Sequence, residues 1–456
     1  MGSQNFDMMR ILILSLFLFW NIQVVCAQKI EPIDSLYLNK LADFLGKVEL
    51  IKDKVWPGMT IGPFCIYRLN GPIFLMNHPQ PPANGTYLRD SIYMLSQADY
   101  ALMGTTQTEI NHYLTAQNNY GQSLYVSETQ FYSELFHELH HVYQRNYIKN
   151  IQFDNPAEIL SYPEDYRNDA IKQYENGLLL EMLFGPSDQF KNNLNRFYSC
   201  RLQRKKIIGD KYLNYEKSVE SLEGPATYCE YMYMKEFSSS EKELEYIHKR
   251  FFYSLVDPTY GRDGLRNKNL LTGMIQCLLL SQHFKDWQQE YYTSGLMLND
   301  YFFSKFQPLP VELPSLSEYE AKSRYFTNME KEKHSQHLQA FNGQAGLRIT
   351  LLFNSFPEFR GFDPMHAEGI NDSLVLHSTL LKLGKDSSDY FNLTNQAVLT
   401  LINKQVWFVK GITLYVPQDA IQFNGHTLVC NTPNVKINWR YLTLEKRENE
   451  YVVTLE

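Results

Sequence analysis

The chain has 456 residues, of which 44% are hydrophobic and 20% are charged, so it can bury one large core and an accessory domain. Its formal net charge is −7, and no basic cluster is dense enough to indicate a nucleic-acid partner. The densest positive run, residues 201–206, is expected on the solvated face of a helix.

The N-terminal residues have the pattern of a cleaved export signal. A basic residue precedes an apolar run over residues 11–20, and residues 25–27 offer small side chains at the usual cleavage spacing. We therefore expect residues 1–27 to be a signal peptide and the mature protein to be exported. The apolar run is short for a membrane span, which leaves an uncleaved anchor as the alternative. Val25 is larger than the residue that usually precedes a lipidated cysteine, which disfavours a lipid anchor at Cys26.

The next part of the chain predicts a small sheet followed by helices. Residues 91–95 and 110–114 are predicted strands, set among loops rich in proline and glycine. Apolar residues then recur at helical spacing as far as residue 305. The predicted helices of this part are 127–146, 166–184, 187–207, 211–236 and 268–284. A charged connecting helix is predicted over residues 316–340.

From about residue 345 the pattern changes to short alternating strands. Asn424-Gly425 is a hairpin signal between two such strands, and the region predicts a β-sandwich or small barrel. The predicted fold class is therefore α+β. It has a mainly helical domain with a small N-terminal sheet over residues 28–315, a connecting helix or linker over 316–344, and an all-β domain over 345–456.

One local pattern indicates a type of reaction, namely the H-E-x-x-H run from His137 to His141. Ser127 and Gln130 are spaced as in a capping box, so a helix is expected to start before the run. On a helix, positions i and i+4 share a face, so both histidines can bind one Zn²⁺. Glu138 then lies beside the metal, where it can take a proton from a zinc-bound water. His140 points away from this face, and a surface or supporting role is expected for it.

A zinc hydrolase needs a third protein ligand, and Glu223 is the best candidate. Its neighbours are apolar or small, where an unpaired carboxylate is costly to bury. Gly224 and Ala226 are small enough to let this segment pack closely against the histidine helix. Glu220, one turn earlier, is the second choice as ligand or as a partner of a ligand. Cys229 adjoins the segment, and the alternative to a buried thiol there is a softer metal ligand.

These two segments resemble the gluzincin metallopeptidases. The run from His137 to Gln144 is similar to their H-E-x-x-H-x-x-Q helix, and the run from Glu220 to Tyr228 is similar to an E-x-x-E-G-x-A-x-Y segment of bacterial members. The resemblance implies a zincin-like domain within residues 28–315. It implies His137, His141 and Glu223 as zinc ligands and Glu138 as general base. It also implies that a sheet edge within residues 91–126 binds the substrate backbone.

The chain departs from that family pattern at two positions. Pro225 stands where a good helix former is usual, so a kink or a first helical turn is expected there. Thr227 occupies the position where an aspartate usually orients a zinc histidine. Another acceptor must take that role, and the candidates are Glu220, Glu230 and Glu134.

The sequence thus predicts an exported zinc metallopeptidase that acts on a peptide or protein. A tyrosine or histidine usually helps to hold the oxyanion, and the candidates are Tyr228, Tyr231, Tyr260 and His283. The main alternative is a non-catalytic surface protein on a peptidase scaffold, whose β domain recognises glycan or protein. A zinc hydrolase of a non-peptide amide is a third possibility.

Overall fold

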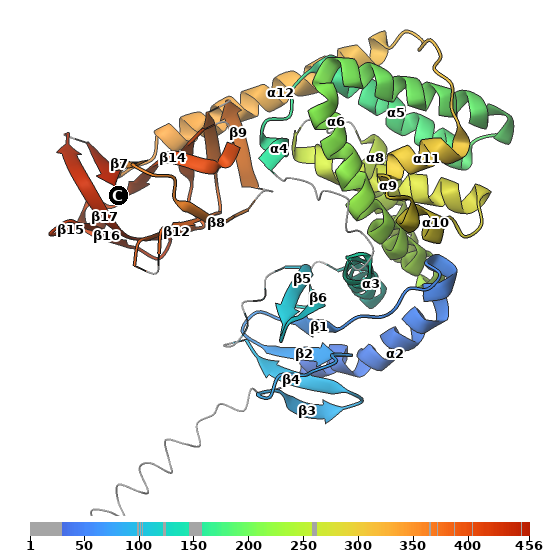
Figure 1. Cartoon of the computed structure of the whole chain (residues 1–456), viewed down its shortest axis with the longest axis horizontal. Helices are drawn as coiled ribbons and strands as arrows, with labels where there is room; N and C mark the ends of the chain where they lie inside the picture. The colour runs from blue at the N-terminus through green and yellow to red at the C-terminus, as the bar shows by residue number, and fades with distance from the viewer. Residues whose placement is uncertain are drawn as a thin grey trace, which may run out of the picture. The chain divides into compact units, whose positions relative to one another are not determined.

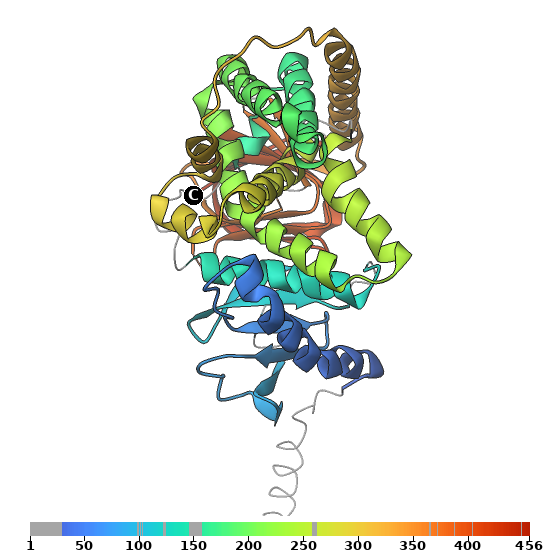
Figure 2. The same ribbon diagram turned by 90° about the vertical axis from the view of Figure 1, so that its right-hand side faces the viewer.

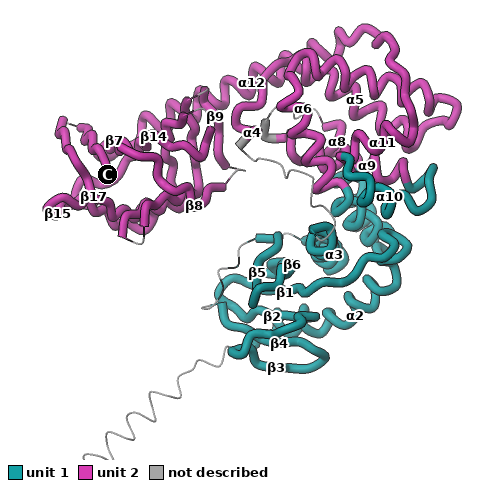
Figure 3. The backbone as a smooth tube through the Cα atoms, in the orientation of Figure 1, with its two compact units in different colours: residues 1–150, 225–251, 281–296 teal, residues 151–224, 252–280, 297–456 magenta. Residues whose placement is uncertain are grey.

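A computed structural model describes residues 30–456 apart from 98, 99, 101, 103, 122–124, 146–156, 258–261, 364, 365, 372, 387, 404 and 448. The predicted signal peptide lies outside the described residues. The chain forms two compact units (Figure 3). Unit 1 comprises residues 1–150, 225–251 and 281–296, and unit 2 comprises the rest. The predicted domain boundaries at 315 and 345 stay predictions.

Unit 1 contains a six-stranded sheet in the order β3-β4-β2-β1-β6-β5 (Figure 1). β1 and β6 are parallel, and the other neighbours are antiparallel. Because β5 ends the order, it is an edge strand. The strands are β1 (Phe64–Tyr67), β2 (Pro72–Met76), β3 (Thr86–Arg89), β4 (Ile92–Ser96), β5 (Thr106–Ile110) and β6 (Tyr113–Asn119).

The two strands predicted in this region had different outcomes. The strand over 91–95 is confirmed as β4. The strand over 110–114 is wrong, because this segment is the turn that joins β5 to β6. Asn111 and His112 take positive φ angles of 45° and 68°, which form a tight hairpin turn. Asparagine tolerates this left-handed conformation. Because neither of the two turn residues is glycine, the sequence indicates a turn here only weakly.

Two helices pack beside this sheet, α2 (Pro32–Val55) and α3 (Glu128–Gln144), as Figures 1 and 2 show. The ring of Phe44 on α2 contacts Phe64 of β1 and Tyr132 of α3. The predicted N-terminal cap of α3 is confirmed, because the Ser127 hydroxyl accepts a hydrogen bond from the Gln130 amide at 3.2 Å. α3 is therefore fixed at its start and along its length.

The longest helix is α6, which combines two predicted helices. It is continuous from Phe190 to Phe237, and Gly209 is its one residue with non-helical angles (φ 80°, ψ 170°). This kink falls between the predicted helices 187–207 and 211–236. The other helices are α4 (Ala157–Leu160), α5 (Tyr166–Phe184), α7 (Glu241–Ile247), the π-helix η2 (His248–Tyr253), α8 (Ser254–Val256), α9 (Arg262–His283), α10 (Trp287–Ser294), α11 (Leu298–Phe306) and α12 (Ser317–Asn342).

A buried cluster of charges holds the two parts of α6 together within unit 2. Arg204, before the kink, donates to Glu216, after the kink, and both are fully buried. Lys172 of α5 lies 3.1 Å from Glu216, and Arg201 pairs with Glu220. The prediction that residues 201–206 lie on a solvated face is therefore wrong for the two arginines. The two arginines are buried here because Glu175 of α5 and glutamates of α6 beyond the kink pair with them.

The C-terminal part of unit 2 is a nearly closed β sheet of twelve strands that follows α12 (Figure 1). Its ten-strand path is β8-β11-β12-β17-β18-β7-β14-β13-β10-β9, and β15 and β16 extend from β17. The predicted hairpin at Asn424-Gly425 is confirmed between β15 and β16. The strands are β7 (Leu347–Phe353), β8 (Glu358–Phe362), β9 (Ala367–Asn371), β10 (Leu374–His377), β11 (Leu380–Gly384), β12 (Tyr390–Thr394), β13 (Val398–Asn403), β14 (Gln405–Val416), β15 (Ile421–Asn424), β16 (Thr427–Asn431), β17 (Val435–Lys446) and β18 (Glu450–Leu455).

The chain thus mixes helices with two separate sheets, which fits the predicted α+β class. Among the described residues, no helix is both long and apolar enough to span a bilayer. The five cysteines of this part of the chain are buried thiols, namely Cys65, Cys200, Cys229, Cys277 and Cys430.

Candidate metal centre

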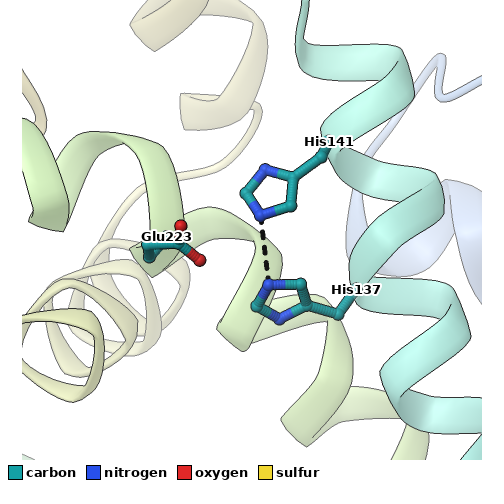
Figure 4. Close-up of side chains that lie close together, drawn as sticks. All are labelled: His137, His141 and Glu223. Atoms are coloured by element: carbon teal, nitrogen blue, oxygen red, sulfur yellow. Dashed lines mark hydrogen bonds between the residues drawn. The ribbon is translucent and has the colours of Figure 1, made fainter. Parts of the chain in front are cut away.

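The structure brings the three predicted ligands together. One ligand atom from each of His137, His141 and Glu223 lies within 4.8 Å of the other two. Figure 4 shows the carboxylate of Glu223 facing the two imidazole rings, which project from α3. The two histidine residues are 9% and 5% exposed, so water screens them little. The i, i+4 spacing on α3 is what places both rings on one face.

The two imidazole rings face each other through their Nε2 atoms. Nδ1 of His137 donates a hydrogen bond to Glu230, so this nitrogen carries a proton. Nδ1 of His141 lies 3.0 Å from the Gln144 side-chain oxygen, which makes it a donor too. The two Nε2 atoms lie 3.1 Å apart, and the dashed line in Figure 4 marks the hydrogen bond that one can donate to the other. When neither Nε2 carries a proton, the same spacing suits a shared cation, because nitrogens on a tetrahedral Zn²⁺ lie about 3.3 Å apart. The residues therefore fit a zinc ion.

The sequence left three candidates for the acceptor that orients a proposed ligand histidine. Glu230 is the candidate that contacts His137. Its Oε2 lies 3.2 Å from Nδ1 of His137, and its side chain is 4% exposed. Glu220 instead accepts hydrogen bonds from Arg201 and from Gln276, so it serves the buried charge cluster of unit 2. Burial, with the negative charge of Glu230, raises the pKa of Glu134 to about 7. Of the three candidate acceptors, Glu230 is thus the one seen in contact with a proposed ligand.

Gln144 is a site residue that the sequence reasoning did not assign. It lies on α3 three residues after His141, so it shares the face of that ring. The i+3 spacing was visible as the last residue of the H-E-x-x-H-x-x-Q pattern. The side chain of Gln144 carries no charge, so the sequence alone does not indicate that it contacts His141.

Glu223 lies on α6 and is held by an arginine that the sequence did not suggest. Arg266 of α9 donates from Nη2 to Oε1 of Glu223 at 2.8 Å. α6 is helical through Pro225, so neither the kink nor the first helical turn predicted there is present, and the kink is at Gly209. Pro225 only removes one backbone donor from the helix.

Gly224 makes a close helix contact, but with a different helix from the predicted one. A Cβ on Gly224 would come within 2.7 Å of the Gly273 backbone, so α6 and α9 touch at these glycines. The prediction that Gly224 and Ala226 let this segment pack closely against the histidine helix stays a prediction. A residue one position after Glu223 points about 100° away around the helix, toward a different neighbour.

Glu138 is a buried carboxylate beside the edge of the N-terminal sheet. It is 6% exposed, and Gln107 of the edge strand β5 donates a hydrogen bond to its Oε2. β5 is thus a sheet edge within residues 91–126 that lies beside Glu138, and its binding of a substrate backbone stays a prediction. Gln107 was not predicted, because a single glutamine in a polar strand gives no signal by itself.

The sequence predicts a surface or supporting role for His140, but this residue is not on the surface. It is fully buried, with its ring against Trp56 and its Nε2 3.1 Å from the Tyr292 hydroxyl. Burial lowers the pKa of this imidazole well below its ordinary value, so it is neutral. The face of α3 that carries His140 is thus packed against aromatic side chains rather than solvated.

The candidates for oxyanion stabilisation differ in their surroundings. The Tyr228 hydroxyl accepts a hydrogen bond from Ser281 at 3.0 Å, and the Tyr231 ring packs on Phe251. His283 is exposed, and Tyr260 lies outside the described residues. Burial raises the pKa of the Cys229 thiol well above its ordinary value, which disfavours a thiolate ligand.

No family model, no curated protein and no solved structure matches the chain. The resemblance to gluzincins therefore rests on the two motif segments.

Proposed function

We propose that the protein is an exported zinc metallopeptidase of gluzincin type. The observation that carries the proposal is the pair of Nε2 atoms 3.1 Å apart, with a carboxylate oxygen of Glu223 in reach and Glu138 on the same helix. Two neutral imidazoles and one carboxylate are a common ligand set of catalytic zinc sites. His137, His141 and Glu223 would hold the ion.

The chain's own side chains would do the proton transfer. A zinc ion in this site supplies a Lewis acid and lowers the pKa of a bound water toward about 7. Glu138 accepts the proton of the attacking water and passes it to the leaving amine. The amide of Gln107 donates to Oε2 of Glu138 and so orients this carboxylate. Glu230 and Gln144 keep both imidazoles in the tautomer that offers Nε2.

The edge strand β5 supports a peptide as the substrate class. Its outer edge has backbone groups with no neighbouring strand in the six-stranded sheet, and its Gln107 touches the proposed base. An extended peptide can pair with such an edge through backbone hydrogen bonds, which act on any sequence. This arrangement would lay a scissile bond beside Glu138.

The test is hydrolysis by the purified protein and by Glu138→Gln, measured by mass spectrometry on a mixed peptide library. We expect about one zinc per chain in both proteins and cleavage by the parent only, because Gln cannot accept the proton. Cleavage by Glu138→Gln at the parent rate would refute Glu138 as base. A parent that binds no added zinc would refute the metal centre and favour a binding role for the β domain.

A further inference from the structure

Arg266 forms an ion pair with the proposed ligand Glu223. Its Nη2 lies 2.8 Å from Oε1, and the two side chains are 33% and 14% exposed. A carboxylate has two oxygens, so it can accept a hydrogen bond from an arginine at one and bind an ion through the other. Arginine is suited to this, because its planar donors fix the orientation of the carboxylate they bind.

The helix on which Arg266 lies is in fixed contact with the helix of Glu223. A Cβ on Gly273 of α9 would come within 2.5 Å of the Glu220 carbonyl oxygen and 2.8 Å of the Gly224 Cα atom. The backbones of α6 and α9 thus touch at this point. Arg266 precedes Gly273 by seven residues, or about two turns, so it lies on the same face of α9. The glycine contact therefore sets the distance over which the arginine reaches Glu223.

We infer that Arg266 is a positioning residue for the metal centre, and this inference rests on the proposed function. It holds Oε1 of Glu223 so that the carboxylate presents its other oxygen toward His137 and His141. A glutamate without such a partner loses more side-chain freedom when it binds an ion. Hydrogen-bond partners of metal ligands commonly change metal affinity by about 10–100-fold.

The charge of Arg266 has the opposite effect, because a cation near the site opposes binding of a second cation. Arg266 is one-third exposed, so solvent and salt screen its charge. Its hydrogen bond at 2.8 Å is a contact and is not screened in the same way. The orienting effect is therefore expected to exceed the repulsion.

The experiment compares the Zn²⁺ dissociation constants of the parent, Arg266→Ala and Arg266→Lys by competition with a chromogenic chelator. Lys217→Ala is the matched control, because Lys217 lies on the same helix as Glu223 and pairs with Asp300 at 2.7 Å. We expect about 10–100-fold weaker binding for Arg266→Ala, a smaller loss for Arg266→Lys and no change for Lys217→Ala. The Co²⁺ absorption spectrum of Arg266→Ala should also differ from that of the parent, because the ligand geometry has changed.

Arg266→Ala that binds zinc as tightly as the parent, or more tightly, would overturn the inference. If Arg266→Ala fails to fold, Arg266→Lys decides by the same criterion, since it keeps the charge and loses the planar fork. A parent that binds zinc and cleaves peptides while both variants match it refutes the role of Arg266 alone. A parent without zinc binding refutes the metal centre itself.

Discussion

Oε2 of Glu230 lies 3.2 Å from Nδ1 of His137, and Glu230 follows Glu223 by seven residues on α6. Seven residues are about two helical turns, so both carboxylates project from one face of one helix. α6 therefore supplies a proposed ligand and also the partner of a second ligand. A substitution at either glutamate should therefore alter the affinity of the same metal site.

Removing the carboxylate of Glu230 should weaken zinc binding. We expect Glu230→Ala to raise the Zn²⁺ dissociation constant about 10–100-fold, because His137 loses the acceptor that fixes its ring and tautomer. Glu230→Gln keeps an acceptor oxygen without the charge, so it should fall between Ala and the parent. The exposed Glu236 on the same helix gives the control Glu236→Ala, which should bind zinc normally. Equal affinity for all four proteins would contradict the role of Glu230.

The glycine contact between α6 and α9 predicts a difference between two Gly→Ala substitutions. Gly273→Ala would place a Cβ 2.5 Å from a backbone oxygen, so α9 must move, and both thermal stability and zinc affinity should fall. Gly177 lies within α5, and a Cβ added to it would meet no atom within 4 Å, so Gly177→Ala should stabilise the protein by about 0.5–1 kcal/mol. Melting temperatures and zinc affinities of both variants check this. A harmless Gly273→Ala would show that the helices can separate freely.

The buried charge cluster predicts a large effect on stability from one arginine. Arg204 contacts both Glu175 and Glu216, and all three are fully buried. Burial alone would raise the pKa of Glu216, but Arg204 and Lys172 hold it well below its ordinary value. Arg204→Ala removes one of the basic partners of both buried glutamates and should cost about 3–5 kcal/mol of unfolding free energy in urea. The exposed Arg447 is the control, and Arg447→Ala should change the midpoint little.

Asp169 should make stability depend on pH. Burial raises its pKa from 3.8 to about 7, so the native state binds this proton more tightly than the unfolded chain. The resulting stabilisation is full below about pH 4 and is lost as the pH rises through about 7. Asp169→Asn removes this loss, and relative to the parent it should gain about 2–4 kcal/mol between pH 4 and pH 8. Urea midpoints of both proteins at the two pH values test this, and parallel profiles would contradict it.

Local patterns in the sequence predicted the elements that local interactions determine. The cap at Ser127, the i, i+4 histidine pair and the hairpin at Asn424-Gly425 each depend on residues within one or two turns. These features are fixed by helix and turn geometry, which the sequence displays directly. The same reasoning placed a break between residues 207 and 211, where Gly209 kinks α6.

What the sequence missed depends on partners that are distant along the chain. The sequence predicted that Arg204 is solvated, because no neighbouring residue indicates its contact with Glu175, which lies 29 residues earlier. His140 is buried by Trp56 and Tyr292, which lie far from it on either side. Arg266 reaches Glu223 across 43 residues. Periodicity describes the face that a residue occupies on its helix, but not the helix that covers this face.

The carboxylates of α6 also limit how this helix can change in length. Glu216 and Glu220 belong to the buried charge cluster, while Glu223 and Glu230 serve the candidate metal centre. One inserted residue between Glu216 and Glu223 would turn everything after it by about 100° and shift it by about 1.5 Å. Either the charge cluster or the metal centre would then lose its glutamates. Any redesign of α6 can exchange exposed residues between these glutamates, but it must keep the number of residues that separate them.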